Sequence, residues 1–175
     1  MRAPPEDETG WDPGPSPGHT KPAPSYRAKL ALVAHSVLPD PTTPYGELVQ
    51  RRLRDEIVVW LTTVGADGTP QPNPVWFLWE GESVLVYNRA DAHRLVHVRA
   101  RPRVALNFDG NGRGGDILVI TGRAELPQGA APPNESPTYV AKYHEHMTRV
   151  SGSPEAFGKA YPVAMRVWPL RVRAF

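Results

Sequence analysis

Three short runs of strand-forming residues, separated by two tight turns, constrain the fold of this chain more than any other feature. The first run, IVVWLTTV at 57–64, is rich in β-branched and aromatic residues, which is typical of strands. GADGT at 65–69 contains Asp67-Gly68, a common hairpin turn. A return strand, PQPNPVWFLWE at 70–80, leads through a second turn to VLVYN at 84–88. These residues therefore predict an antiparallel meander.

The segments around this meander alternate between helical and strand patterns. Further strands are predicted at 103–109, 116–126 and 162–175, and helices at 26–37, 45–56, 90–102 and 138–150. We expect the 45–56 helix to bury Leu48 and Leu53, and Asp91 to cap the 90–102 helix, which ends at Pro102. The 138–150 helix presents one stripe, formed by Tyr139, Tyr143, His146 or Met147, and Val150. About six strands, mostly antiparallel, favour a closed barrel, which leaves few exposed edges.

Composition limits the classes of function. Residues 1–25 are proline-rich and nearly lack large apolar side chains, so we expect a disordered tail, followed by one domain over 26–175. The chain has no cysteine, which excludes disulfides and thiolate nucleophiles. A net charge of +2 is too small to indicate nucleic acid binding, and no apolar run is long enough to span a membrane. We therefore expect a cytoplasmic protein with no nucleic acid or membrane partner.

The stretch QPNPVWFLW at 71–79 is unusual for a strand. Pro72 and Pro74 cannot donate ladder hydrogen bonds, so they predict an edge, a bulge or a rim. Trp76, Phe77 and Trp79 then offer flat apolar walls on which a planar heterocycle could stack. The alternative is that these aromatic rings only pack in the core or at a dimer interface.

The segment from Arg89 to Arg103 is basic and begins a predicted helix. Arg94 lies in the first helical turn and Arg89 just before it, which suits a phosphate bound at a helix N-terminus. A solvated basic helix face explains the same residues. His93 and His97 have the spacing of a helical metal pair, but no third ligand is evident, so no metal is predicted.

No catalytic constellation emerges from spacing. The glycine-rich GNGRGG at 110–115 connects two strands rather than a strand and a helix, so it indicates a hairpin and not a dinucleotide-binding loop. No serine, histidine and acid show the arrangement of a hydrolase. The catalytic residues remain unknown at this stage.

The order VVWLTTVGADGTPQPNPVWFLW, VLVYNRADAHRLVHVRARPRVAL and GDILVITGRAEL resembles the FMN-binding split-barrel family of pyridoxamine-phosphate-oxidase-like proteins, and within it the branch that uses the deazaflavin F420. The resemblance implies a mainly β fold, a six-stranded antiparallel split β-barrel with short helices. It also implies a homodimer with cofactor sites at the subunit interface. Hydride transfer between F420 and an electron-poor small organic substrate would be the activity. An FMN-dependent oxidase or reductase, or a non-catalytic flavin- or haem-binding module, are the alternatives.

The resemblance also assigns cofactor-binding residues. The ring would lie against the return strand, and the third strand and following helix would hold the ribityl chain and phosphate. The matching positions are Thr62, Asn73, Pro74, Val75, Trp76 and Phe77 for the ring, and Tyr87, Asn88, Arg89, His93 and Arg94 for the chain and phosphate, while Trp168 would reach the partner's site.

Overall fold

A single curled antiparallel sheet dominates the computed structural model, which describes Ala28 and residues 37–174. The predicted tail and most of the predicted 26–37 helix lie outside the described residues. The sheet of the described part has the strand order β2-β1-β5-β6-β7-β4-β3. Its strands are β1 (Val58–Val64), β2 (Pro70–Trp76), β3 (Leu78–Trp79), β4 (Val84–Asn88), β5 (Arg103–Phe108), β6 (Leu118–Glu125) and β7 (Val163–Ala174). The predicted mainly β fold class is confirmed.

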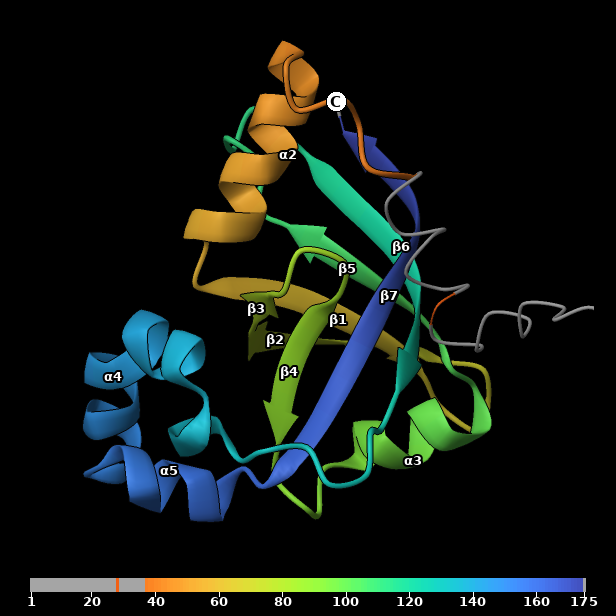
Figure 1. Cartoon of the computed structure of the whole chain (residues 1–175). Coiled ribbons are helices and arrows are strands. Elements are labelled where there is room, and N and C mark those ends of the chain that lie inside the picture. The colour runs from red at the N-terminus through yellow and green to blue at the C-terminus, as the bar shows by residue number, and fades with distance from the viewer. Residues whose placement is uncertain (1–27, 29–36, 175) are drawn as a thin grey trace, which may run out of the picture.

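The return strand is interrupted at Phe77, which explains why the described part has seven strands where we expected six. β2 pairs with β1, whereas β3 pairs with β4. The two halves are neighbours in sequence but stand at opposite ends of the sheet order. Because Phe77 lies between β2 and β3 in the chain, the sheet must curl until its two edges meet there. Figure 1 shows the labelled β2 and β3 next to each other. This junction is the seam of the split barrel.

The prolines of β2 do not remove any hydrogen bond from the ladder between β1 and β2. The Gly65 N–H donates to the Thr69 oxygen at 3.0 Å, so these two residues form a hydrogen-bonded pair at the hairpin. Hydrogen-bonded and non-hydrogen-bonded pairs alternate along an antiparallel ladder. The register pairs Val64 with Pro70, Thr62 with Pro72 and Trp60 with Pro74, so each proline occupies a non-hydrogen-bonded position. Their nitrogens face the open edge, as an edge strand permits.

Helices cover the ends and one side of the barrel. They are α2 (Pro44–Asp55), α3 (His93–Ala100), α4 (Pro137–Ser151) and α5 (Pro154–Ala160), with a short 3₁₀ helix, η1 (Pro133–Glu135). Figure 1 shows α2 and α3 at opposite ends of the sheet, and α4 and α5 packed together at its side. The sequence analysis missed α5, because its seven residues include a glycine and give too short a pattern.

Two details of the predicted helices are wrong. α3 begins after Ala92 without a side-chain cap, and Asp91 instead pairs with Arg89 at 3.3 Å on the surface. In α2 the fully buried side chains are Val49 and Leu53, whereas Leu48 is only partly buried. Because Val49 and Leu53 lie four residues apart, they share one face of the helix.

Two hydrophobic clusters lie on opposite faces of the sheet. Inside the barrel, Val84 and Val86 of β4 join the main core. Leu85 and Tyr87 alternate with them and point outward, into a second cluster formed with α4 and α5. Within the described residues, no helix is both long and apolar enough to cross a bilayer.

Candidate functional site

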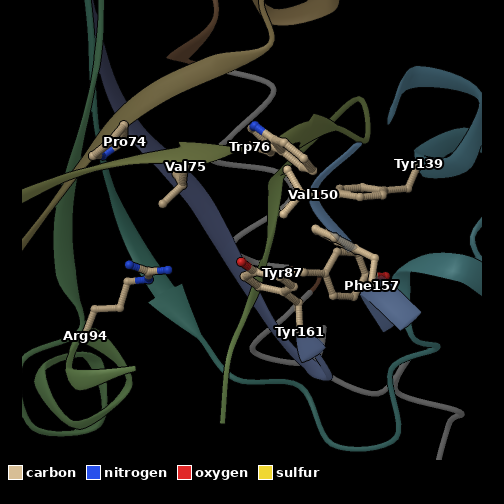
Figure 2. Close-up of a pocket in the computed structure, with 9 residues that line it drawn as sticks. All are labelled: Pro74, Val75, Trp76, Tyr87, Arg94, Tyr139, Val150, Phe157 and Tyr161. Atoms are coloured by element: carbon tan, nitrogen blue, oxygen red, sulfur yellow. The ribbon is translucent and has the colours of Figure 1, made fainter. Parts of the chain in front are cut away.

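A pocket of about 220 Å³ opens outside the barrel, between the edge of β2 and the α4–α5 pair. Figure 2 shows Arg94 on one side of this pocket and a group of aromatic side chains on the other. Its described lining is Pro74, Val75 and Trp76 of β2, Tyr87 of β4, Arg94 of α3, Tyr139 and Val150 of α4, Phe157 of α5, and Tyr161. Segments far apart in sequence therefore build one site.

The aromatic side of the pocket is built from stacked rings. The Trp76 indole stacks on Tyr143 and on Phe157, with 5.2 Å between ring centroids in each case. Phe157 stacks in turn on Tyr161 at 4.4 Å. Trp76 thus packs in the second cluster, as the packing alternative for the aromatic stretch expected, and it also lines the pocket.

Arg94 supplies the positive charge that lines the pocket in the described part of the chain. Its Nε donates to Asn88 Oδ1 at 2.6 Å. Asn88 is fully buried, and its amide nitrogen donates to the carbonyl oxygens of Val86 and Val163 at 3.2 and 3.1 Å. The guanidinium is therefore held by its Nε, and its two terminal nitrogens have no protein partner among the described residues.

The charge of Arg94 is not balanced by a carboxylate among the described residues. Burial lowers the pKa of its guanidinium, because a half-buried cation loses hydration. No carboxylate of the described residues pairs with Arg94, although buried charges are normally paired. The geometry therefore favours the phosphate interpretation of Arg94 over a solvated basic face.

The structure brings together only part of the residue set implied by the resemblance. Pro74, Val75, Trp76, Tyr87 and Arg94 line the pocket, and Asn88 supports Arg94 from behind. The other residues of the set lie outside the described lining: Phe77, Thr62, Asn73, Arg89, His93 and Trp168.

These six residues differ in how far they are buried. Phe77 is fully buried in the barrel core, with its ring edge-on to Phe108 at 5.4 Å. Thr62 and Asn73 are partly buried on neighbouring strands, and Arg89 and His93 are exposed. Trp168 is buried on β7, and its indole nitrogen has no partner in the described part of the chain.

The sequence analysis missed the contribution of the C-terminal helices to the site. Tyr139 and Val150 belonged to a predicted stripe, but nothing local showed which surface that stripe would cover. Phe157 and Tyr161 lie in and just after the unforeseen α5. Their aromatic character was the available signal, and it does not distinguish core packing from a pocket wall.

Within the described residues, no group of three or more potential metal-ligating side chains occurs. His97 of the suspected helical pair instead shares a hydrogen bond with Thr63 Oγ1 through its Nδ1, at 3.0 Å. The pocket can thus offer aromatic faces, one fixed guanidinium and the carbonyl edge of β2.

We compared the chain with protein-family models, with curated protein sequences and with solved structures. A family model described as pyridoxamine 5'-phosphate oxidase matches residues 46–173. A solved structure named F420 reductase superposes with a TM-score of 0.55 and 23% identity, covering 70% of this chain and 94% of that one. No curated protein sequence matches the chain.

Two further solved structures are similar. One is a putative pyridoxamine 5'-phosphate oxidase from Listeria innocua, with a TM-score of 0.52, 21% identity and coverage of 73% of this chain and 94% of that one. The other is HutZ, described as a heme storage protein, from Vibrio cholerae, with a TM-score of 0.51, 14% identity and coverage of 72% and 91%. At such identities these likenesses show the fold alone.

Proposed function

This chain belongs to the pyridoxamine 5'-phosphate oxidase family, and we propose that it is an oxidoreductase that binds F420 in the pocket beside β2. The cofactor's phosphate binds Arg94, and its planar ring lies near Pro74, Val75 and Trp76. When bound, F420 supplies hydride chemistry toward an electron-poor small organic substrate. The protein's own contribution is to bind the cofactor, orient it and exclude water.

The observation that carries this proposal is how the Arg94 guanidinium is held and what its terminal nitrogens face. Its Nε is held by a fully buried asparagine, and its terminal nitrogens face a pocket with no carboxylate in its described lining. A guanidinium fixed in this way presents two parallel N–H donors, which match the oxygens of a phosphate. The residues present therefore fit the phosphate end of a flavin-type cofactor.

The rest of the pocket fits a planar ring system. Pro74 and Trp76 give flat walls, and the open edge of β2 offers carbonyl oxygens as acceptors. Pockets for cofactor-sized ligands usually measure about 300–1,000 Å³, so a volume of about 220 Å³ accommodates only part of such a molecule. The remainder extends outward, which supports a site completed by a second subunit.

FMN is the second candidate cofactor, because it carries the same kind of ring and phosphate. F420 differs by an acidic oligoglutamate extension, and the exposed Arg99 at the end of α3 suits that extension. Haem storage receives less support, because the described lining contains no histidine, cysteine or methionine, and tyrosine is the one haem-ligating residue type that it offers.

A paired titration of the cofactor-free protein with F420 and with FMN, followed by fluorescence polarisation, tests the proposal. We expect tighter binding of F420. The reverse order would move the protein to the FMN-dependent enzymes. Binding of neither cofactor would contradict the proposed site. A bound cofactor that never changes redox state with any acceptor would favour a non-catalytic module.

A further inference from the structure

Among the tyrosines that line the pocket, Tyr139 combines an almost fully buried side chain with a hydroxyl that has no hydrogen-bond partner among the described residues. Three tyrosines lie close together between β4 and α4: Tyr87 belongs to β4, and Tyr139 and Tyr143 belong to α4. The Tyr87 hydroxyl donates to the Ala131 oxygen at 2.9 Å, and the Tyr143 hydroxyl bonds to the backbone of Phe77 and Ile57. Tyr139 is only 1% exposed, yet its hydroxyl bonds to no described residue. Figure 2 shows its ring reaching from α4 toward the other lining side chains.

The Tyr139 hydroxyl is open to the pocket. Its oxygen is not among the fully buried, unpartnered side-chain atoms of the described residues, and the Tyr139 side chain is part of the pocket lining. Because Tyr139 lines the pocket, a ligand there can supply the missing acceptor. Burial also raises the pKa of Tyr139, so its hydroxyl stays protonated and able to donate at neutral pH.

The chemistry of the acceptor follows from the surroundings. The Tyr139 ring lies edge-on to Tyr87 at 4.9 Å and contacts Tyr143 at 4.6 Å, so its environment is aromatic and weakly polar. An ionised group would lose its hydration there, and Arg94 is the better partner for a charge. A neutral carbonyl oxygen on a planar ring can accept the hydrogen bond while the ring contacts the aromatic walls.

We propose that the Tyr139 hydroxyl donates a hydrogen bond to a ring carbonyl of the ligand, and so determines which planar molecules the pocket accepts. This inference rests on the proposed function in taking the pocket as the ligand site. The carbonyl belongs either to the cofactor's own ring or to the substrate. Tyr139 therefore selects for a neutral carbonyl, and Arg94 for an anion.

A matched pair of small probes tests this role without the cofactor. 1-Indanone carries one conjugated carbonyl on a planar bicycle, and indane is its counterpart without the oxygen. We expect the full chain to bind 1-indanone more tightly than indane. Tyr139→Phe should weaken 1-indanone binding by about two- to twelvefold, as for one hydrogen bond, and leave indane binding unchanged. Tyr45→Phe, at a partly exposed tyrosine of α2, is the control and should change neither affinity.

Infrared spectroscopy gives a second readout that a purely structural role would not change. The carbonyl stretch of bound 1-indanone should lie at lower wavenumber than in a hydrocarbon solvent, and Tyr139→Phe should move it back. A bound stretch at the hydrocarbon value in the wild type would overturn the proposal, even if the variant does not fold. Equal losses for both probes, or no binding of 1-indanone to the wild type, would also overturn it.

Adding F420 distinguishes the two sources of the carbonyl. If F420 displaces 1-indanone, the carbonyl that meets Tyr139 is the cofactor's own. If both bind together and the infrared shift persists, it belongs to the substrate. Failure of the proposed function appears separately, as an absence of F420 and FMN binding, while the 1-indanone measurements still decide the role of Tyr139.

Discussion

At the scale of single residues, Tyr143 holds the seam of the barrel. Its hydroxyl accepts from the Phe77 N–H at 2.9 Å and lies 2.6 and 2.9 Å from the carbonyl oxygens of Phe77 and Ile57. Its ring stacks on Trp76 at 5.2 Å. One side chain of α4 therefore satisfies the backbone where the return strand is interrupted, and supports a wall of the pocket.

Replacing this hydroxyl should destabilise the protein. We expect Tyr143→Phe to lower the free energy of unfolding by about 1–3 kcal/mol, because the buried Phe77 N–H loses its partner. Denaturant unfolding measures this change. Tyr139→Phe, one helical turn away, is the matched control and should lose no stability, since the hydroxyl it removes has no hydrogen-bond partner in the described part of the chain. Equal unfolding midpoints for wild type and Tyr143→Phe would show that the seam does not depend on Tyr143.

At the scale of elements, β2 is an edge strand adapted to proline at alternate positions. The nitrogens of Pro70, Pro72 and Pro74 face away from β1, whereas Gln71 and Asn73 occupy the hydrogen-bonded positions of the ladder. An edge without N–H donors is a poor template for another strand. It also leaves carbonyl acceptors free beside the pocket.

This alternation predicts opposite effects at adjacent positions. Gln71→Pro should destabilise the protein by roughly 1–3 kcal/mol, because it removes the N–H that bonds to Thr63. Pro72→Thr should change stability by no more than about 0.5 kcal/mol, the usual range for surface substitutions. Thermal unfolding of the two variants checks this contrast. Similar losses of stability in both variants would mean that we have assigned the wrong alternate residues of β2 to the hydrogen bonds with β1.

The elements also show how far the sequence can predict this fold. The strands from β1 to β7 follow local patterns of β-branched residues and turns, and most boundaries agree within two residues. The resemblance correctly indicated the split-barrel fold and the family. At the interruption, the backbone of Phe77 bonds to Tyr143, which is 66 residues away in the chain, so no local pattern could reveal this contact.

The candidate site was predictable only in part, for the same reason. Pro74, Val75 and Trp76 follow from an unusual strand, and Arg94 follows from its place at a helix start. The wall formed by Tyr139, Phe157 and Tyr161 depends on where α4 and α5 dock. Their amphipathic pattern predicts a buried face but does not identify its partner.

At the scale of the whole molecule, the outer face of β1 leaves apolar side chains uncovered. Val58 is 38% exposed and Trp60 40% exposed. The register places Trp76 and Pro74 directly opposite them on β2, so these four residues form one apolar strip next to the pocket. Exposed apolar strips of this kind mark association surfaces. We therefore predict that two copies of the chain pair through this strip.

Sedimentation at micromolar concentration tests this prediction. We expect the wild type to sediment as a dimer of the 19.3 kDa chain. Trp60→Glu should shift the protein toward the monomer, because a charge in the strip would lose its hydration on association. A wild type that sediments only as a monomer would contradict the dimer.

The central claim, that Arg94 binds the cofactor's phosphate, is tested most directly by the affinity of Arg94→Ala for whichever of F420 and FMN the wild type binds more tightly. We expect binding to weaken by about 1.5–3 kcal/mol, as for a hydrogen bond to a charged group. Arg113→Ala, at an exposed arginine of the loop between β5 and β6, is the matched control and should bind like the wild type. Unchanged affinity in Arg94→Ala would remove Arg94 from the phosphate site and contradict the account.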